Sequence, residues 1–306
     1  MEEDRLVQPI DIGVAERTIQ KRIPGLKIDS IQYLGGGSYS VFAVNDEVIF
    51  RFPKYEAASA LAAFEVENKA LELIRPRVSP HKIPTPLYQL TDVDDLFPGP
   101  VYGYKLLSGG RVLDSIEVRE HLPHLLGDFL TRLHKIDLKL VYELGLDRTS
   151  ADAVRQGWHD AYEELTQTVL PILNPEERRW VDNLYETYLS AVGSVQPPVV
   201  LAHGDLGDEN VLLPGELDRL HVIDFEDAGP NDPAVDFCIW WGMFGDGFID
   251  EMIGHYGLNT GDQFMSRVAF YYNRIPMIYF KFGVVNDNDK FIRYGHDLLQ
   301  SRMMEV

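Results

Sequence analysis

The chain has 306 residues, 45% of them hydrophobic, which is enough to bury a large core and to form two lobes. Its formal net charge is −20, from 48 acidic and 28 basic residues, so it has no basic stripe with which to bind nucleic acid. The single cysteine excludes an internal disulfide framework, and no apolar stretch approaches the roughly 20 residues of a transmembrane helix, so we expect a soluble cytoplasmic protein that does not bind membranes.

The first segment combines a helix with strands joined by a glycine-rich turn. Apolar residues at helical spacing predict a helix over residues 9–24. Strands are expected at 28–34, 41–44 and 47–52, and the turn after the first strand contains Gly35, Gly36, Gly37 and Ser38. Such a turn lets backbone N–H groups approach phosphates without obstruction by side chains. We therefore expect it to cover the phosphates of a nucleotide, although many β-hairpins have glycine-rich turns without this role.

The strand at 47–52 and the helix after it carry a cation and an acid that we expect to pair. Alternation places Arg51 on the face of the strand opposite its apolar residues. Glu67 lies on the apolar face of a helix predicted at 56–74, and an inward carboxylate needs a partner. We predict an Arg51–Glu67 ion pair, with Arg51 rather than Lys54 as the cation that meets nucleotide phosphates.

Strands predicted at 84–91 and 100–107 complete a small sheet. We expect an N-lobe of residues 1–106 that binds nucleotide phosphates and a C-lobe of residues 107–306 that binds substrate. Tyr104 and Leu106 lie in the segment between the lobes, where backbone groups are expected to meet the purine edge of the nucleotide. The pattern does not distinguish ATP from GTP.

The sequence beyond residue 118 is helical in character. A stripe of apolar residues ends at His134, which we expect to be a structural histidine rather than a base. Residues 150–193 are expected to form two helices of a helical insertion. The last two helices are predicted at about 262–285 and 288–302.

The segment 201–236 holds three oxygen-bearing side chains at a distinctive spacing. Asp205 precedes Asn210 by five residues, and two short strands around a turn then lead to Asp224. Because a hairpin brings its two ends together, we expect Asn210 and Asp224 to lie side by side, with Asp205 nearby. Oxygen donors of this kind are the ligands that Mg²⁺ takes in proteins. A solvated turn would explain any one of these residues, but their joint spacing predicts a magnesium and phosphate site.

The same residues stand in a recognisable order. His203-Gly204-Asp205-Leu206, Asn210 and Asp224-Phe225-Glu226 resemble the catalytic loop and the metal-binding motif of protein kinases. Gly204 and Glu226 replace the Arg and Gly of those motifs, and no A-P-E follows, which argues against a protein kinase. With D-A-x-x-x-D-P-x-x-D completing the segment, the chain resembles the aminoglycoside phosphotransferase family, which includes macrolide phosphotransferases.

The resemblance implies an α+β, two-lobed protein-kinase-like fold with a β-rich N-lobe and a helical C-lobe. It implies that Asp205 orients the substrate hydroxyl and accepts its proton, and that Asn210 and Asp224 bind Mg²⁺ with ATP or GTP as phosphoryl donor. Arg51 would neutralise the nucleotide phosphates and Glu67 would position Arg51.

Two further residues are expected to support the catalytic loop. Asp236 and His203 would brace the loop rather than touch substrate.

We expect the protein to be a monomer or a weak dimer.

Two features of the sequence favour different substrates. Residues 201–260 contain 13 acidic residues against one basic residue, a net charge of −12, which would attract a cationic small molecule; ordinary surface acidity is the alternative. Residues 237–244 are aromatic instead of acidic, with Trp240, Trp241 and Phe244, and so resemble the macrolide branch. We predict an aminoglycoside as phosphoryl acceptor, with a macrolide or a small amino-alcohol or sugar as alternatives. A pseudokinase with a scaffolding role is disfavoured because Asp205, Asn210 and Asp224 are intact.

Overall fold

The structure, a computed structural model, describes residues 10–54, 57–92, 94–112, 116–145, 150–192, 197–215 and 218–304. The chain forms two compact units. The first comprises Met1–Gly110 and Leu212–Glu226, and the second comprises Arg111–Val211 and Asp227–Val306. The segment that carries Asp224 thus returns to the unit formed by the N-terminal third of the chain.

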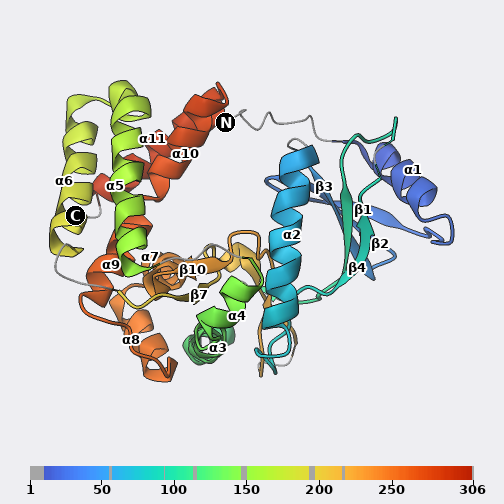
Figure 1. Ribbon diagram of the computed structural model, residues 1–306, viewed down its shortest axis with the longest axis horizontal. Helices are drawn as coiled ribbons and strands as arrows, with labels where there is room; N and C mark the ends of the chain where they lie inside the picture. Colours follow the sequence, from blue (N-terminus) through green and yellow to red (C-terminus); the bar gives the residue numbers. More distant parts are fainter. Residues whose placement is uncertain are drawn as a thin grey trace. The chain divides into compact units, whose positions relative to one another are not determined.

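The first unit is built on a five-stranded antiparallel sheet with the strand order β1-β2-β3-β5-β4. In Figure 1 this sheet lies between the two helices of the unit. The predicted strands and helices of this segment are confirmed, with ends that differ by a few residues. The elements are α1 (Ile12–Arg22), β1 (Ile31–Gly35), β2 (Tyr39–Val44), β3 (Val48–Pro53), α2 (Ala57–Ile74), β4 (Pro86–Leu90) and β5 (Val101–Lys105).

Alternation along β3 decides what each face of the sheet packs against. Phe50 and Phe52 lie in a buried core with residues of α1, and burial of each ring contributes roughly 1.5–3 kcal/mol. Arg51, between them, bonds to a side chain of α2. On that same side Phe64 of α2 stacks on Tyr102 of β5, with ring centroids 3.4 Å apart. The sheet therefore has one mainly apolar face and one face that carries a buried charge.

A small sheet attaches the segment 212–226 to the first unit. Strands β6 (Gly110–Arg111), β8 (Val211–Leu213) and β9 (His221–Val222) are neighbours in the order β6-β8-β9, so the predicted hairpin is confirmed. The Lys82 N–H donates to the Leu220 carbonyl at 2.9 Å, and the Lys82 carbonyl accepts from the Val222 N–H at 2.9 Å. These two bonds fix the chain immediately before Asp224.

The second unit is mostly helical. Strands β7 (Val200–Ala202) and β10 (Gly229–Asn231) pair antiparallel, and short 3₁₀ helices lie at η2 (Leu170–Ile172), η3 (Asp208–Asn210) and η4 (Pro233–Phe237). The predicted apolar stripe before His134 is buried in α3. No helix among the described residues is long and apolar enough to cross a membrane. The α-helices are α3 (Ile116–His134), α4 (Leu138–Glu143), α5 (Ala151–Thr168), α6 (Pro175–Val192), α7 (Cys238–Phe244), α8 (Asp246–His255), α9 (Phe264–Asn273), α10 (Ile275–Val285) and α11 (Asp289–Met304).

The predicted single helix over residues 262–285 is wrong. The structure has two helices there, α9 and α10, with the break at Arg274. Pro276 lies in the first turn of α10, and proline has no N–H to donate to the carbonyl four residues earlier. The helix therefore ends before Pro276 and a new one begins.

Candidate active site

The predicted catalytic loop lies between β7 and η3 in the second unit. The side-chain amide of Asn210 donates to the Asp205 carbonyl at 2.8 Å and to Asp205 Oδ2 at 3.1 Å. Because an amide has donors only on its nitrogen, these bonds leave the Asn210 Oδ1 available as an acceptor or a metal ligand. Asp205 itself is exposed. The structure thus brings two of the predicted residues together and leaves the Asp205 carboxylate accessible.

A fully buried carboxylate holds this loop in place. Asp236 accepts hydrogen bonds from the backbone N–H groups of His203 and Gly204, both at 2.8 Å, and its Oδ2 lies 2.9 Å from His134 Nε2. Gly204 has φ +89°, and a Cβ there would lie 2.5 Å from the Asp227 carbonyl oxygen. Burial alone would raise the pKa of Asp236, but the bond and charge of His134 and the backbone donors lower it overall. The predicted bracing role of Asp236 and the structural role of His134 are confirmed.

In the first unit, Arg51 is surrounded by three carboxylates. Its Nη1 lies 2.9 Å from Glu67 Oε1, and its Nη2 lies 3.0 Å from Asp224 Oδ1 and 3.3 Å from Glu226 Oε2. The predicted Arg51–Glu67 pair is confirmed. Burial would lower the pKa of the Arg51 guanidinium, but the Glu67 and Asp224 carboxylates outweigh it and raise this pKa well above its ordinary value. Arg51 is therefore a permanent cation beside the predicted metal ligand Asp224.

Tyr104 extends this cluster behind Arg51. Its hydroxyl donates to Glu67 Oε2 at 2.8 Å, and Glu67, with a side chain only 2% exposed, thus has partners on both oxygens. Burial, and then the negative charge of Glu67, raise the pKa of Tyr104. The Leu106 N–H donates to the Glu47 carbonyl at 2.8 Å. The Tyr104 side chain therefore orders the ion pair, while contact of the backbone at 104–106 with a purine stays a prediction.

Asp224 adopts an unusual backbone conformation. Its φ is +67°, in the left-handed region that only glycine and short polar residues such as Asp and Asn adopt routinely. The next residue, Phe225, is completely buried, whereas the Asp224 side chain is 38% exposed. The chain thus turns sharply to leave the carboxylate at the surface of the first unit, where Arg51 binds it.

The glycine-rich turn has the shape that its sequence requires. Gly36 has φ +122°, and a Cβ there would lie 2.3 Å from the Tyr39 carbonyl oxygen. The Lys54 ammonium donates to the carbonyls of Gly36 and Gly37, at 2.8 and 3.0 Å. Lys54 therefore stabilises the turn, which leaves Arg51 as the cation next to Asp224.

The chemistry of the donor set fits Mg²⁺. Among the described residues no three His, Cys, Asp or Glu side chains form a group that could hold a metal ion by themselves. Mg²⁺ bound with a nucleotide takes one or two protein ligands, together with phosphate oxygens and water. The Asp224 carboxylate and the Asn210 Oδ1 are hard oxygen donors of this kind, and their joint role as metal ligands stays a prediction. Asn210 belongs to the second unit and Asp224 to the first.

Sequence reasoning missed the part that Glu226 and Tyr39 play around Arg51. The Tyr39 ring lies 3.9 Å from the Arg51 guanidinium carbon, in the range of a cation–π contact. Glu226 gave a signal, since it stands where protein kinases have glycine. No such signal marks Tyr39, because tyrosine is common as the first residue of a strand.

Comparisons with known proteins identify the family and the fold of the chain. A model of the phosphotransferase enzyme family matches residues 30–271. An aminoglycoside 2″-phosphotransferase of type IIIa, solved with GDP and kanamycin, superposes with a TM-score of 0.83 at 21% sequence identity, covering 95% of this chain and 98% of that one. A macrolide 2′-phosphotransferase from Brachybacterium faecium superposes with a TM-score of 0.73 at 19% identity, covering 93% and 97%.

Another aminoglycoside 2″-phosphotransferase, of type IIa and solved with streptomycin and ATP, has a TM-score of 0.67 at 19% identity and covers 96% of this chain and 97% of that one. Identities this low show the fold alone. The fold is the two-lobed protein-kinase-like one, with a β-rich N-terminal part and a helical C-terminal part. Since the family model spans well over half of the sequence, the chain belongs to the phosphotransferase enzyme family.

Proposed function

We propose that the protein transfers the γ-phosphoryl group of ATP or GTP to a hydroxyl group of an aminoglycoside. The observation that carries the proposal is the exposed Asp205 carboxylate, with Asn210 bonded to it. A loop clamped by the buried Asp236 holds the pair in place. This arrangement fits a base that must meet a substrate hydroxyl next to a metal ligand. We further propose that the protein acts in the cytoplasm as a monomer or weak dimer.

Asp205 would act on the acceptor. Its carboxylate would accept a hydrogen bond from the substrate hydroxyl, orient the oxygen toward the γ-phosphorus and take up the proton as the phosphoryl group is transferred. The Asn210 amide holds the Asp205 carboxylate through one bond to Oδ2 and the Asp205 backbone through a second bond to its carbonyl. Pre-positioning of this kind lowers the entropic cost of bringing the reactants together.

Arg51 and the glycine-rich turn would act on the donor. Arg51 would neutralise charge on the nucleotide phosphates, and Glu67 would position it together with Tyr104. The turn at residues 35–38 would cover the phosphates. Asn210 and Asp224 would hold Mg²⁺, which supplies neutralisation of the phosphate oxygens when bound.

Acids near the catalytic loop support a cationic acceptor. Asp205 and Glu209 are both exposed, and their negative charges add to the effect of burial and of Tyr294 in raising the pKa of Tyr279 on α10. This side of the second unit thus combines negative charge with an aromatic side chain. Both features suit the ammonium groups and the sugar rings of an aminoglycoside.

The macrolide alternative rests on the aromatic residues of α7, and these are largely occupied. Trp240 is completely buried. The indole N–H of Trp241 donates to Asp246 at 2.7 Å, and its ring packs against Tyr272. Because Trp240 is buried in the core and Trp241 packs against Tyr272, these rings offer less apolar surface to a macrolactone than the sequence indicates. We therefore place aminoglycosides first and keep a macrolide, amino-alcohol or sugar as alternatives.

A transfer assay tests the proposal. The purified chain is incubated with Mg²⁺, ATP or GTP, and one acceptor at a time from a set that contains kanamycin, gentamicin, streptomycin, a macrolide, an amino-alcohol and a sugar. Mass spectrometry then detects addition of a phosphate group. We expect a phosphorylated aminoglycoside, loss of product with Asp205→Asn, and little change with Asp208→Asn three residues away. Product with the macrolide alone would select that alternative, and no product with any acceptor would refute the proposal.

A further inference from the structure

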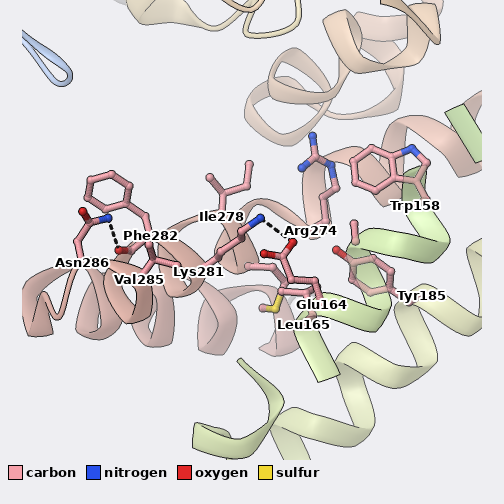
Figure 2. Close-up of a pocket in the computed structure, with 12 residues that line it drawn as sticks. Trp158, Glu164, Leu165, Tyr185, Arg274, Ile278, Lys281, Phe282, Val285 and Asn286 are labelled. Carbon is pink, nitrogen blue, oxygen red and sulfur yellow. Dashed lines mark hydrogen bonds and ion pairs between the residues drawn. The ribbon is translucent and has the colours of Figure 1, made fainter. Parts of the chain in front are cut away.

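Helices α5, α6 and α10 of the second unit line an open pocket of about 410 Å³ (Figure 2). A volume of this size lies within the range of small-molecule sites. None of the residues proposed above for phosphoryl transfer lines it. Much of its wall is apolar, from Trp158, Leu165, Met277, Ile278, Phe282 and Val285.

Three of the polar side chains at the pocket already have partners. Glu164 and Lys281 form an ion pair with 2.7 Å between Oε2 and Nζ, and both are about half exposed. The Asn286 amide donates to the Phe282 carbonyl at 2.9 Å. These groups neither require a ligand nor add net charge to the pocket.

Arg274 differs from them. Within the described part of the chain its guanidinium forms no hydrogen bond or ion pair, and its Nε is buried without a partner. The guanidinium carbon lies 4.4 Å from the centroid of the Trp158 ring, so the cation is held against a flat apolar surface. An arginine without an acidic partner is unexpected in a protein of net charge −20, because buried donors are normally satisfied.

Tyr185 supplies a second donor to the same pocket. It is only 2% exposed, and its hydroxyl has no hydrogen-bond partner among the residues that the structure describes. In Figure 2 this hydroxyl is directed to the side where Arg274 and Glu164 lie. Burial raises the pKa of Tyr185 to about 12, against the opposing charge of Arg274, so at neutral pH the hydroxyl keeps its proton and can donate it. Two donors without acceptors therefore converge on one apolar pocket.

We propose that this pocket binds a small amphipathic anion, with a flat apolar body and a carboxylate or sulfonate group. The apolar body would lie along Trp158 and Ile278, and the anionic group would accept hydrogen bonds from Arg274 and Tyr185. A carboxylate or sulfonate completes the bonds that the protein leaves open, and charge-assisted hydrogen bonds of this kind are the strongest in proteins. An ammonium compound would be repelled by Arg274, so the site differs in charge preference from the proposed acceptor site.

The test uses the full chain and the fluorescent probe 8-anilinonaphthalene-1-sulfonate. We expect saturable binding of one probe molecule, with energy transfer from tryptophan. Arg274→Gln should weaken binding about tenfold, the loss expected for one charge-assisted hydrogen bond, and Tyr185→Phe should weaken it a few-fold. The matched control is Arg293→Gln on α11, since Arg293 is exposed, and it should leave binding unchanged.

A neutral analogue separates charge recognition from unspecific apolar binding. N-phenyl-1-naphthylamine has the same rings without the sulfonate, and Arg274→Gln should not weaken its binding. Equal affinity of the wild type for both probes, or sulfonate binding that neither Arg274→Gln nor Tyr185→Phe alters, would overturn the proposal. Melting temperatures of the variants show whether they are folded. If Arg274→Gln does not fold, Tyr185→Phe still tests the site. Phosphoryl transfer is measured separately, so either proposal can fail without the other.

Discussion

Glu226 offers a sharp test of how Arg51 is used, because it adds a third carboxylate to a single guanidinium. A nucleotide phosphate that binds Arg51 must compete with Glu226 for Nη2 or approach it against the charge of Glu226. Glu226→Gln removes this charge and keeps the shape of the side chain. We predict that the variant binds nucleotide more tightly than the wild type.

The geometry sets the size of this effect. A hydrogen bond to a charged group contributes about 1.5–3 kcal/mol. The Arg51–Glu226 contact is long, at 3.3 Å, and the Glu226 side chain is 25% exposed, so we take about 1 kcal/mol, the upper end for exposed pairs. This corresponds to an affinity about fivefold higher.

Isothermal titration with ADP or GDP and Mg²⁺ measures the change in Kd directly. Glu65→Gln is the matched control, since Glu65 is exposed on the same helix as Glu67, and its Kd should equal that of the wild type. If Glu226→Gln binds nucleotide with equal or lower affinity, Glu226 does not compete for Arg51 and the reasoning is refuted.

Three further variants test the elements that support the site. Tyr104→Phe removes the donor to Glu67, so we expect a loss of about 2 kcal/mol and a melting temperature lower by several degrees, measured by calorimetry. Asp236→Asn should destabilise the protein at neutral pH. The folded protein lowers the pKa of the Asp236 carboxyl. The stabilisation that this carboxylate contributes is therefore complete above the ordinary Asp pKa and is lost as the pH falls through the lowered value. The difference in free energy of unfolding between Asp236→Asn and the wild type should thus shrink in unfolding curves at acid pH. Gly36→Ala forces a Cβ into a carbonyl oxygen at φ +122°, and it should raise the KM for nucleotide with a stability loss of about 1–3 kcal/mol.

Each of these variants has a control. Tyr33→Phe alters a half-exposed ring and should leave the melting temperature unchanged, and Asp250→Asn alters an exposed acid of α8 and should not destabilise the protein at neutral pH. Gly25→Ala adds a Cβ that meets nothing within 4 Å and should preserve the KM. A control that behaves like its test variant would show that the effect does not come from the named contact.

The pairing of Arg51 with Glu67 could be predicted from sequence because two local periodicities determine it. Strand alternation turns Arg51 away from the apolar face, and helical spacing turns Glu67 inward. Each pattern lies within a single strand or helix and needs no knowledge of the rest of the chain. The hairpin at residues 211–223 was predictable for the same reason, since turn residues lie between two short apolar runs.

The bonds of Arg51 to Asp224 and Glu226 could not be predicted in this way. They join residues about 170 positions apart in the sequence, and they depend on the small sheet that returns the segment 212–226 to the first unit. The break at Arg274 was missed for a different reason. The apolar run is continuous on both sides of it, and only Pro276 marks the position where the backbone cannot continue a helix.

The most direct test concerns the two proposed metal ligands, Asn210 and Asp224. Electron paramagnetic resonance of Mn²⁺ in place of Mg²⁺, with a non-hydrolysable nucleoside triphosphate, measures how much metal the protein binds. We predict that Asn210→Ala and Asp224→Ala each weaken Mn²⁺ binding about tenfold or more, without a loss of folded protein by circular dichroism. If both variants bind Mn²⁺ and nucleotide as tightly as the wild type, these residues do not form the metal site and the proposed mechanism is contradicted.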